Sequence, residues 1–147
     1  MNNINFDDNS LKELLESGGG IPGNYITAVG KTEWDQYRWN DHSIAEKKNI
    51  INSVDAVFTA AENVTAFQRA REKLISEGVN SKLLDCSDAH DFMNSDNKDR
   101  IGNCFLWLKA DPTFRGLKVA LQDYDNRVFV GDEPPVFRRM RKNPRHF

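Results

Sequence analysis

The alternation of short apolar runs with segments of helical periodicity, from residue 25 onward, is what most constrains the fold of this chain. Strand-length runs rich in β-branched, aromatic and leucine residues recur as "YITAV", "VDAVFTAA", "SKLLDC", "CFLWLKA" and "RVFV". Helical patterns such as "NVTAFQRAREKLISEG" separate them. Strands that alternate with helices at this spacing predict an α/β fold with about four βα units and a parallel sheet. They are too few to close an eight-stranded barrel.

Capping residues indicate where the longer helices begin and end. Asn63 or Thr65 is the expected N-cap of the helix in "NVTAFQRAREKLISEG", and Gly78 is expected to end it. In "DPTFRGLKVALQ", Asp111 is the expected N-cap and Pro112 the first helical residue.

Three parts of the chain differ in composition. Residues 1–24 contain a short amphipathic helix, with Ser10 as the expected N-cap, and a glycine-rich junction, "SGGGIPGN". Residues 25–135 carry the strand and helix pattern, including a helix for which Ser43 is the expected N-cap. Residues 136–147, "VFRRMRKNPRHF", are basic and contain no acid, so we expect a solvated tail or a linker there.

Composition excludes several classes of protein. The 147 residues are 39% hydrophobic and 29% charged with a net charge of −2, which is typical of a globular domain and not of a disordered chain. No apolar run approaches the roughly 20 residues of a membrane helix, and "MNNINFDDNS" is polar where a signal peptide is basic and then apolar. We therefore expect a cytoplasmic protein without membrane contact. Cys86 and Cys104 are then expected as small packed side chains and not as a disulfide.

Asp88 and His90 are the candidate metal ligands. They follow the run "SKLLDC", and ligands of parallel α/β folds gather at the carboxyl ends of the strands. Side chains two residues apart on an extended strand point the same way, so these two would converge on a zinc, manganese or iron ion. The alternative is a turn role for Asp88 and an exposed loop position for His90. The other histidines, His42 and His146, have no motif around them, and the spacing selects no catalytic residue.

A basic cluster and a pair of tryptophans are candidate contacts to nucleic acid. Trp34 and Trp39 lie close together in one loop, where they either stack on bases or pack over the edge of the sheet. Trp107 alternates within an apolar run and is expected in the core. Four cations that can contact phosphate groups lie near the end of the sequence: Arg138, Arg139, Arg141 and Lys142.

Several stretches taken together resemble a known family. They are "AVGKTEWDQYRWNDHSIAEKKNIINSVDAVFTAAE", "KLLDCSDAHDF", "DRIGNCFLWLKADPTFRGLKVAL" and "RVFVGDEPP". They are similar, from about Tyr25 to Pro135, to the C-terminal part of the PHP (polymerase and histidinol phosphatase) domain of TrlF-like proteins, where it precedes an ABC/SMC-like ATPase. The resemblance implies a distorted (β/α)7 barrel that binds up to three metal ions and hydrolyses phosphate mono- or diesters. It matches Asp88 and His90 to the last metal motif of the family, D-x-H.

The sequence departs from the family at the other metal motifs. It has no counterpart of the first H-x-H motif, of the middle histidine and glutamate motifs, or of the ATPase. The resemblance therefore implies a partial barrel without its first half, and a divalent ion that two ligands hold only weakly. We expect an interaction module that is not a competent phosphoesterase alone and that binds a PHP-ATPase protein or a chain supplying the missing half. The alternative is half of a metal-dependent phosphoesterase or nuclease that another chain completes, and the exposed barrel edge is a further surface for oligomerisation.

Overall fold

The computed structural model of the chain describes residues 8–17, 21–35, 38–40, 42–96 and 101–143. Helices and strands alternate through most of these residues, as the sequence predicts. The helices are α1 (Asp8–Ser17), α2 (Lys31–Trp34), α3 (Ile44–Ser53), α4 (Val64–Ser76), α5 (Phe114–Gln122), α6 (Tyr124–Arg127) and α7 (Pro135–Lys142). The strands are β1 (Ala28–Val29), β2 (Ala56–Thr59), β3 (Leu83–Asp85), β4 (Leu106–Leu108) and β5 (Val128–Val130).

The central sheet has three parallel strands in the order β1-β2-β3, which confirms an α/β fold with parallel pairing. The fourth predicted strand does not join this sheet. Instead, β4 pairs with β5 in a separate antiparallel ladder in which Trp107 lies opposite Phe129. Side chains occupy the backbone groups near β3: the Phe105 N–H donates to the Asp85 carboxylate, and the Tyr124 hydroxyl donates to the Leu83 carbonyl. These contacts separate β4 from the parallel sheet.

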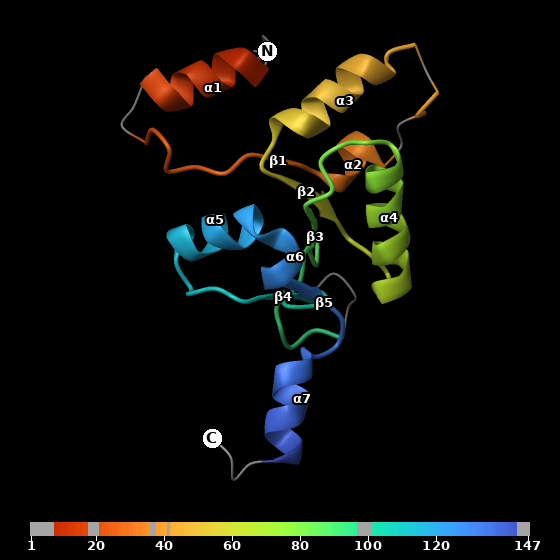
Figure 1. Cartoon of the computed structure of the whole chain (residues 1–147), viewed down its shortest axis with the longest axis vertical. Helices are drawn as coiled ribbons and strands as arrows, with labels where there is room; N and C mark the ends of the chain where they lie inside the picture. The colour runs from red at the N-terminus through yellow and green to blue at the C-terminus, as the bar shows by residue number, and fades with distance from the viewer. Residues whose placement is uncertain (1–7, 18–20, 36–37, 41, 97–100, 144–147) are drawn as a thin grey trace.

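Helices lie on both faces of the sheet (Figure 1), and most strand side chains are buried, although Phe58 of the central strand is 38% exposed. Because neighbouring residues of a strand point to opposite faces, β2 and β3 contribute to two cores. One core combines Val57 and Leu83 with side chains of α3 and α4, and the other combines Ala56 and Leu84 with Leu121 and Tyr124. The first core is the larger, and its most buried side chains are Trp34, Ile51, Leu74, Leu83 and Val57.

The predicted caps are correct for α4 and wrong for α5. The Asn63 side chain accepts a hydrogen bond from the Ala66 N–H at 2.9 Å, which fixes the first turn of α4. At α5 the cap is Thr113 and not Asp111, because the Thr113 hydroxyl accepts from the Gly116 N–H at 3.0 Å. A Cβ on Gly116 would lie 2.2 Å from the Asp111 carbonyl oxygen, so only glycine allows the chain before α5 to approach the helix this closely.

Other helix boundaries also differ from the expectations. The helix α1 begins at Asp8, two residues before the predicted cap Ser10. Ser43 does precede α3, but its side chain makes no capping hydrogen bond. Gly78 has a φ of 67° just after α4, in the left-handed region that glycine adopts without strain, as predicted.

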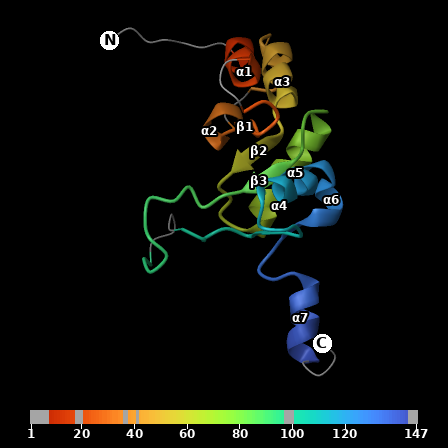
Figure 2. The same ribbon diagram turned by 90° about the vertical axis from the view of Figure 1, so that its left-hand side faces the viewer.

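Both terminal helices extend from the body of the protein, and they do so at opposite ends (Figure 1). The described part of residues 136–147 is exposed to solvent, and most of it forms α7. Its helical conformation is favoured by Pro135 in the first turn, where the missing N–H needs no partner. The segment after β3 also extends away from the sheet, to one side (Figure 2). Among the described helices, none has the length and apolar character that a membrane crossing requires.

Candidate functional site

A pocket of about 490 Å³ lies at the carboxyl ends of the three parallel strands. It is built from the segments that follow β1, β2 and β3, and from the segment that leads into β4. Parallel α/β sheets bind ligands at this edge, because the loops there vary while the strands hold them rigidly. The lining residues are Lys31, Ala60, Ala61, Glu62, Cys86, Ser87, Asp88, Asn103 and Phe105.

Asp85, the last residue of β3, holds two walls of this pocket together. Its side chain is buried, and its two carboxylate oxygens accept hydrogen bonds from the Ala61 N–H and the Phe105 N–H, each at 2.9 Å. Both partner residues line the pocket. The sequence offers Asp85 as one of several acid candidates but does not select it; its place at the end of an apolar strand was the available signal. We conclude that Asp85 positions the site and does not bind ligands itself.

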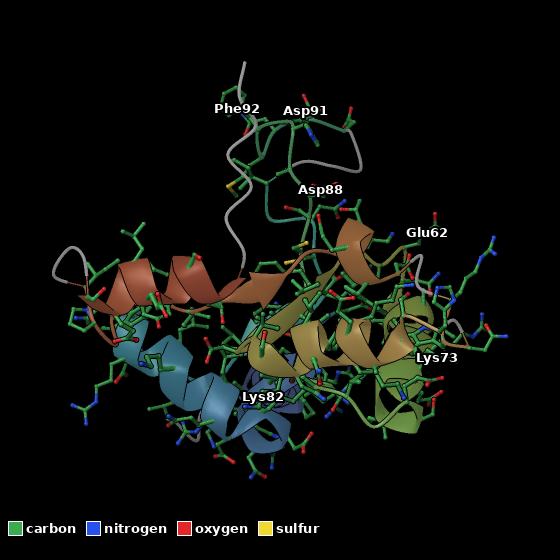
Figure 3. All side chains as sticks on the ribbon, turned by 90° about the horizontal axis from the view of Figure 1, so that it is seen from above. Glu62, Lys73, Lys82, Asp88, Asp91 and Phe92 are labelled. Carbon is green, nitrogen blue, oxygen red and sulfur yellow. The ribbon has the colours of Figure 1, made fainter. Side chains whose placement is uncertain are left out.

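Asp88 lies in the pocket lining, whereas His90 does not. Asp88 has a φ of 48°, a left-handed conformation that aspartate tolerates better than most residues. Because β3 ends at Asp85, neither ligand candidate is on an extended strand, so the argument that placed both side chains on one face does not apply. Both residues are exposed, and Figure 3 shows that the chain carries Asp91 and Phe92 further from the sheet than Asp88.

Lys31 is a pocket residue that sequence analysis missed. It directly follows β1 and Gly30, and its ammonium group donates to the Ala60 carbonyl at 3.2 Å. This contact ties the end of β1 to the end of β2. The rule that predicted Asp88 also selects Lys31, because both follow strands that end at the same edge. The pocket therefore contains charges of both signs, with Lys31 as the cation and Glu62 and Asp88 as the anions.

Cys86 packs as a small, half-buried side chain, as predicted. Burial raises the pKa of its thiol; a hydrogen bond to the backbone of Asp88 opposes the rise, and the nearby charges of Asp85 and Asp88 add to it. The Sγ atom lies 3.1 Å from the Thr59 carbonyl oxygen, to which it donates. Cys86 and Cys104 are free thiols. A raised thiol pKa disfavours the thiolate form that a sulfur nucleophile needs.

The described residues do not bring a third ligand to Asp88 and His90. No group of three or more His, Cys, Asp and Glu side chains within the described ranges has the arrangement of a metal site. His42 is exposed just before α3, and His146 lies outside the described residues. A divalent ion needs three or more protein ligands to be held against water.

The structure confirms packing for Trp34 and Trp39 and contradicts the core position predicted for Trp107. Trp34 is 2% exposed and its indole N–H donates to the Phe58 carbonyl at 2.8 Å, so it belongs to the core. Trp39 packs against the same core, which confirms packing and not base stacking for this pair. Trp107, predicted in the core, is 39% exposed, because one face of its two-stranded ladder lies open. Its N–H donates to the Gly131 carbonyl at 3.0 Å.

The predicted basic cluster lies on α7, which extends from the body of the protein at the end away from α1 and α3 (Figure 1). Arg141 pairs with Glu133 at 3.2 Å, whereas no such pair with a described residue is found for Arg138, Arg139 or Lys142. All four side chains are exposed. The structure thus keeps the cluster at the surface, where phosphate groups can reach it.

Comparison of the chain with protein-family models gave no match, and comparisons with curated proteins and with solved structures gave none either.

Proposed function

We propose that this chain is a PHP-like half-domain that contributes one wall of a metal-dependent phosphoesterase site and is not catalytically competent alone. The observation that carries this proposal is the pocket at the carboxyl ends of β1, β2 and β3, with Asp88 in its lining. This is the edge at which the family resemblance assigns the D-x-H motif. In this proposal the three parallel strands are part of a barrel whose other strands come from a second polypeptide.

The pocket suits phosphate ester chemistry once further ligands are supplied. The Asp88 carboxylate in its lining and the His90 imidazole, which lies outside the lining, offer oxygen and nitrogen donors for zinc, manganese or iron. Such an ion would supply an activated water as the nucleophile. The ammonium group of Lys31 is in the same lining and can bind a phosphate oxygen, whereas Asp85 holds the surrounding backbone in place.

The incomplete ligand set is the reason for a partner. Because two protein ligands bind a divalent ion weakly, the site requires donors from another polypeptide, either a PHP-ATPase protein or a chain with the H-x-H half of the barrel. The exposed apolar side chains beside the ligand candidates favour such a contact: Phe92 is 83% exposed and Met93 is 66% exposed. The pure interaction module expected from the sequence differs in one respect: it forms the same complex, but the assembled site hydrolyses no phosphate ester.

Co-expression with the H-x-H half of a PHP domain tests the proposal. We expect the chain alone to hydrolyse no bis(4-nitrophenyl) phosphate with Mn²⁺ or Zn²⁺, and the assembled pair to hydrolyse it. Asp88→Asn and His90→Ala should each lower the rate of the pair by about 100-fold, because each removes a metal ligand.

Asp96→Asn is the matched control, since it neutralises an exposed carboxylate of the same segment outside the pocket lining. A complex that forms but stays inactive supports the pure interaction module. Hydrolysis by the chain alone that survives Asp88→Asn contradicts the proposal, and so does the absence of any complex.

A further inference from the structure

A second concave surface lies between the β4–β5 ladder and α7, and it shares no lining residue with the Asp88 pocket. This groove has a volume of about 610 Å³, which is within the range of ligand sites in proteins. Its walls combine aromatic rings with basic side chains. The aromatic rings include those of Trp107 and Phe137, and the basic side chains include those of Lys109 and Arg139. Asp125 is an acidic residue of the same lining.

We propose that this groove binds single-stranded nucleic acid, with bases stacked on Trp107 and Phe137 and phosphates held by the cations of α7. Proteins that bind single strands combine a positively charged groove with aromatic side chains on which bases stack. The basic residues of α7 are the ones that the sequence predicted to contact phosphate groups. The aromatic partners are different ones, because Trp34 and Trp39 are packed in the core.

The aromatic wall is open to a ligand. Trp107 is 39% exposed and Phe137 is 43% exposed, although their ring centroids lie only 5.7 Å apart with an interplanar angle of 49°. The indole N–H of Trp107 donates to the Gly131 carbonyl, which fixes the ring plane. A ring that is held in place yet exposed can stack on a base with little loss of side-chain entropy.

The charges of α7 complement a polyanion. Arg139 lines the groove together with Lys109, whereas Arg138 and Lys142 lie outside the lining, on the face of α7 that continues from Arg139. Val136, Phe137 and Met140 form the apolar face. Since the whole chain has a net charge of −2, this positive surface is local and does not reflect a generally basic protein.

The acids near the groove do not cancel this charge. The Asp125 carboxylate, which lines the groove, is already bound by the Arg71 guanidinium. Glu133 is bound by Arg141. Among the described residues, the cations left for phosphate groups are Lys109 and Arg139 in the groove lining and Arg138 and Lys142 beside it. Asn126 first, and then Arg127 and Lys109, lower the pKa of the Asp123 carboxyl.

Anisotropy of a fluorescein-labelled oligodeoxythymidylate of about 12 nucleotides tests the proposal on the full chain, in EDTA. We expect binding that weakens steeply between about 50 and 200 mM salt. Arg138→Ala/Arg139→Ala should weaken binding by about tenfold or more and lower the salt slope by about 1 to 2. Trp107→Ala should weaken it by about fivefold or more at every salt concentration.

Two control variants separate this site from general electrostatics and from the Asp88 pocket. Arg69→Ala/Arg115→Ala removes the same charge from exposed positions on α4 and α5 and should change affinity by less than about threefold. Asp88→Asn should bind as the wild type does, because the groove is independent of the proposed metal site. Failure of the groove to bind nucleic acid and failure of the Asp88 pocket to support hydrolysis are therefore separate results.

Several results would overturn the proposal: no binding at low salt, equal losses in the two double-arginine variants, or wild-type affinity in Trp107→Ala. Tighter binding of a duplex of the same sequence would also overturn it, because paired bases cannot stack on the groove wall. If inorganic polyphosphate binds as tightly as the oligonucleotide, the groove binds anions through charge alone, and stacking of bases contributes nothing.

Discussion

The parallel sheet and the β4–β5 ladder are built from similar apolar runs, yet they present opposite surfaces. In the sheet, polar groups are satisfied inside the protein: the Trp34 indole binds a backbone carbonyl and both Asp85 oxygens accept backbone N–H groups. In the ladder, Trp107 and Leu108 are each 39% exposed beside a basic helix. Helices on both faces bury most side chains of the sheet, with Phe58 as an exposed exception, whereas the ladder has two strands and none of their residues is fully buried. How completely helices cover a strand, more than the composition of the strand, decides whether it belongs to the buried scaffold or to an exposed surface.

Substituting one tryptophan in each region gives the largest expected contrast. Trp34→Ala should lower the free energy of unfolding by about 3–5 kcal/mol, because it leaves a cavity in the larger core and an unpaired Phe58 carbonyl. Trp107→Ala should lower it by only about 1 kcal/mol, the value of a partly exposed contact and one hydrogen bond. Urea denaturation followed by circular dichroism measures both. Equal losses would show that the ladder is as much a part of the core as the sheet.

The two aspartates at the carboxyl end of β3 provide the next contrast. Asp85→Ala should lower the free energy of unfolding by about 2–4 kcal/mol, because it removes the acceptor of two backbone N–H groups. Asp88→Asn should change it by less than about 0.5 kcal/mol, since the side chain is exposed and asparagine also tolerates the left-handed backbone. The same denaturation experiment applies. A large loss in Asp88→Asn would mean a structural and not a ligand-binding role for Asp88.

The smallest of the three expected contrasts in stability concerns Tyr124, and it appears only at alkaline pH. Burial raises the pKa of its hydroxyl from the ordinary value of 10 to about 12; Asp125 also raises it, whereas Arg71 opposes the rise. The neutral hydroxyl therefore contributes stability that is complete below pH 10 and is lost as the pH rises from 10 to 12, roughly 2 kcal/mol in all.

Comparing wild type with Tyr124→Phe at several pH values measures this contribution. Other groups that titrate in this range, Tyr25 and the lysines, are present in both proteins, so they cancel in the difference. We expect the difference in unfolding free energy to decrease from pH 10 to pH 12. A difference that stays constant would mean that the hydroxyl is accessible to water, and that the Leu83 contact does not bury it.

Local signals predicted what depends on a few neighbouring residues. The runs that became β1, β2 and β3, the N-cap Asn63 and the end of α4 at Gly78 follow from side-chain shape, capping and backbone freedom. The strand-end rule placed Asp88 at the pocket, although it missed Lys31 at the end of the neighbouring strand. The α5 cap was wrong because Asp111 and Thr113 are both good caps, and only the approach of Asp111 to Gly116 decides between them.

The sequence by itself determined the alternation of strands and helices, the parallel pairing of the first three strands and the clustering of cations near residue 140. Those features depend on periodicity and local chemistry, which can be read within a window of a few residues. Only the tertiary structure decided that β4 pairs with β5, that Trp34 is buried while Trp107 is exposed, and that Trp107 meets the basic helix. Such features depend on contacts between residues distant in the chain: the Asp85 carboxylate accepts from the Phe105 N–H, the Tyr124 hydroxyl donates to the Leu83 carbonyl, and β4 pairs with β5 in a ladder of its own.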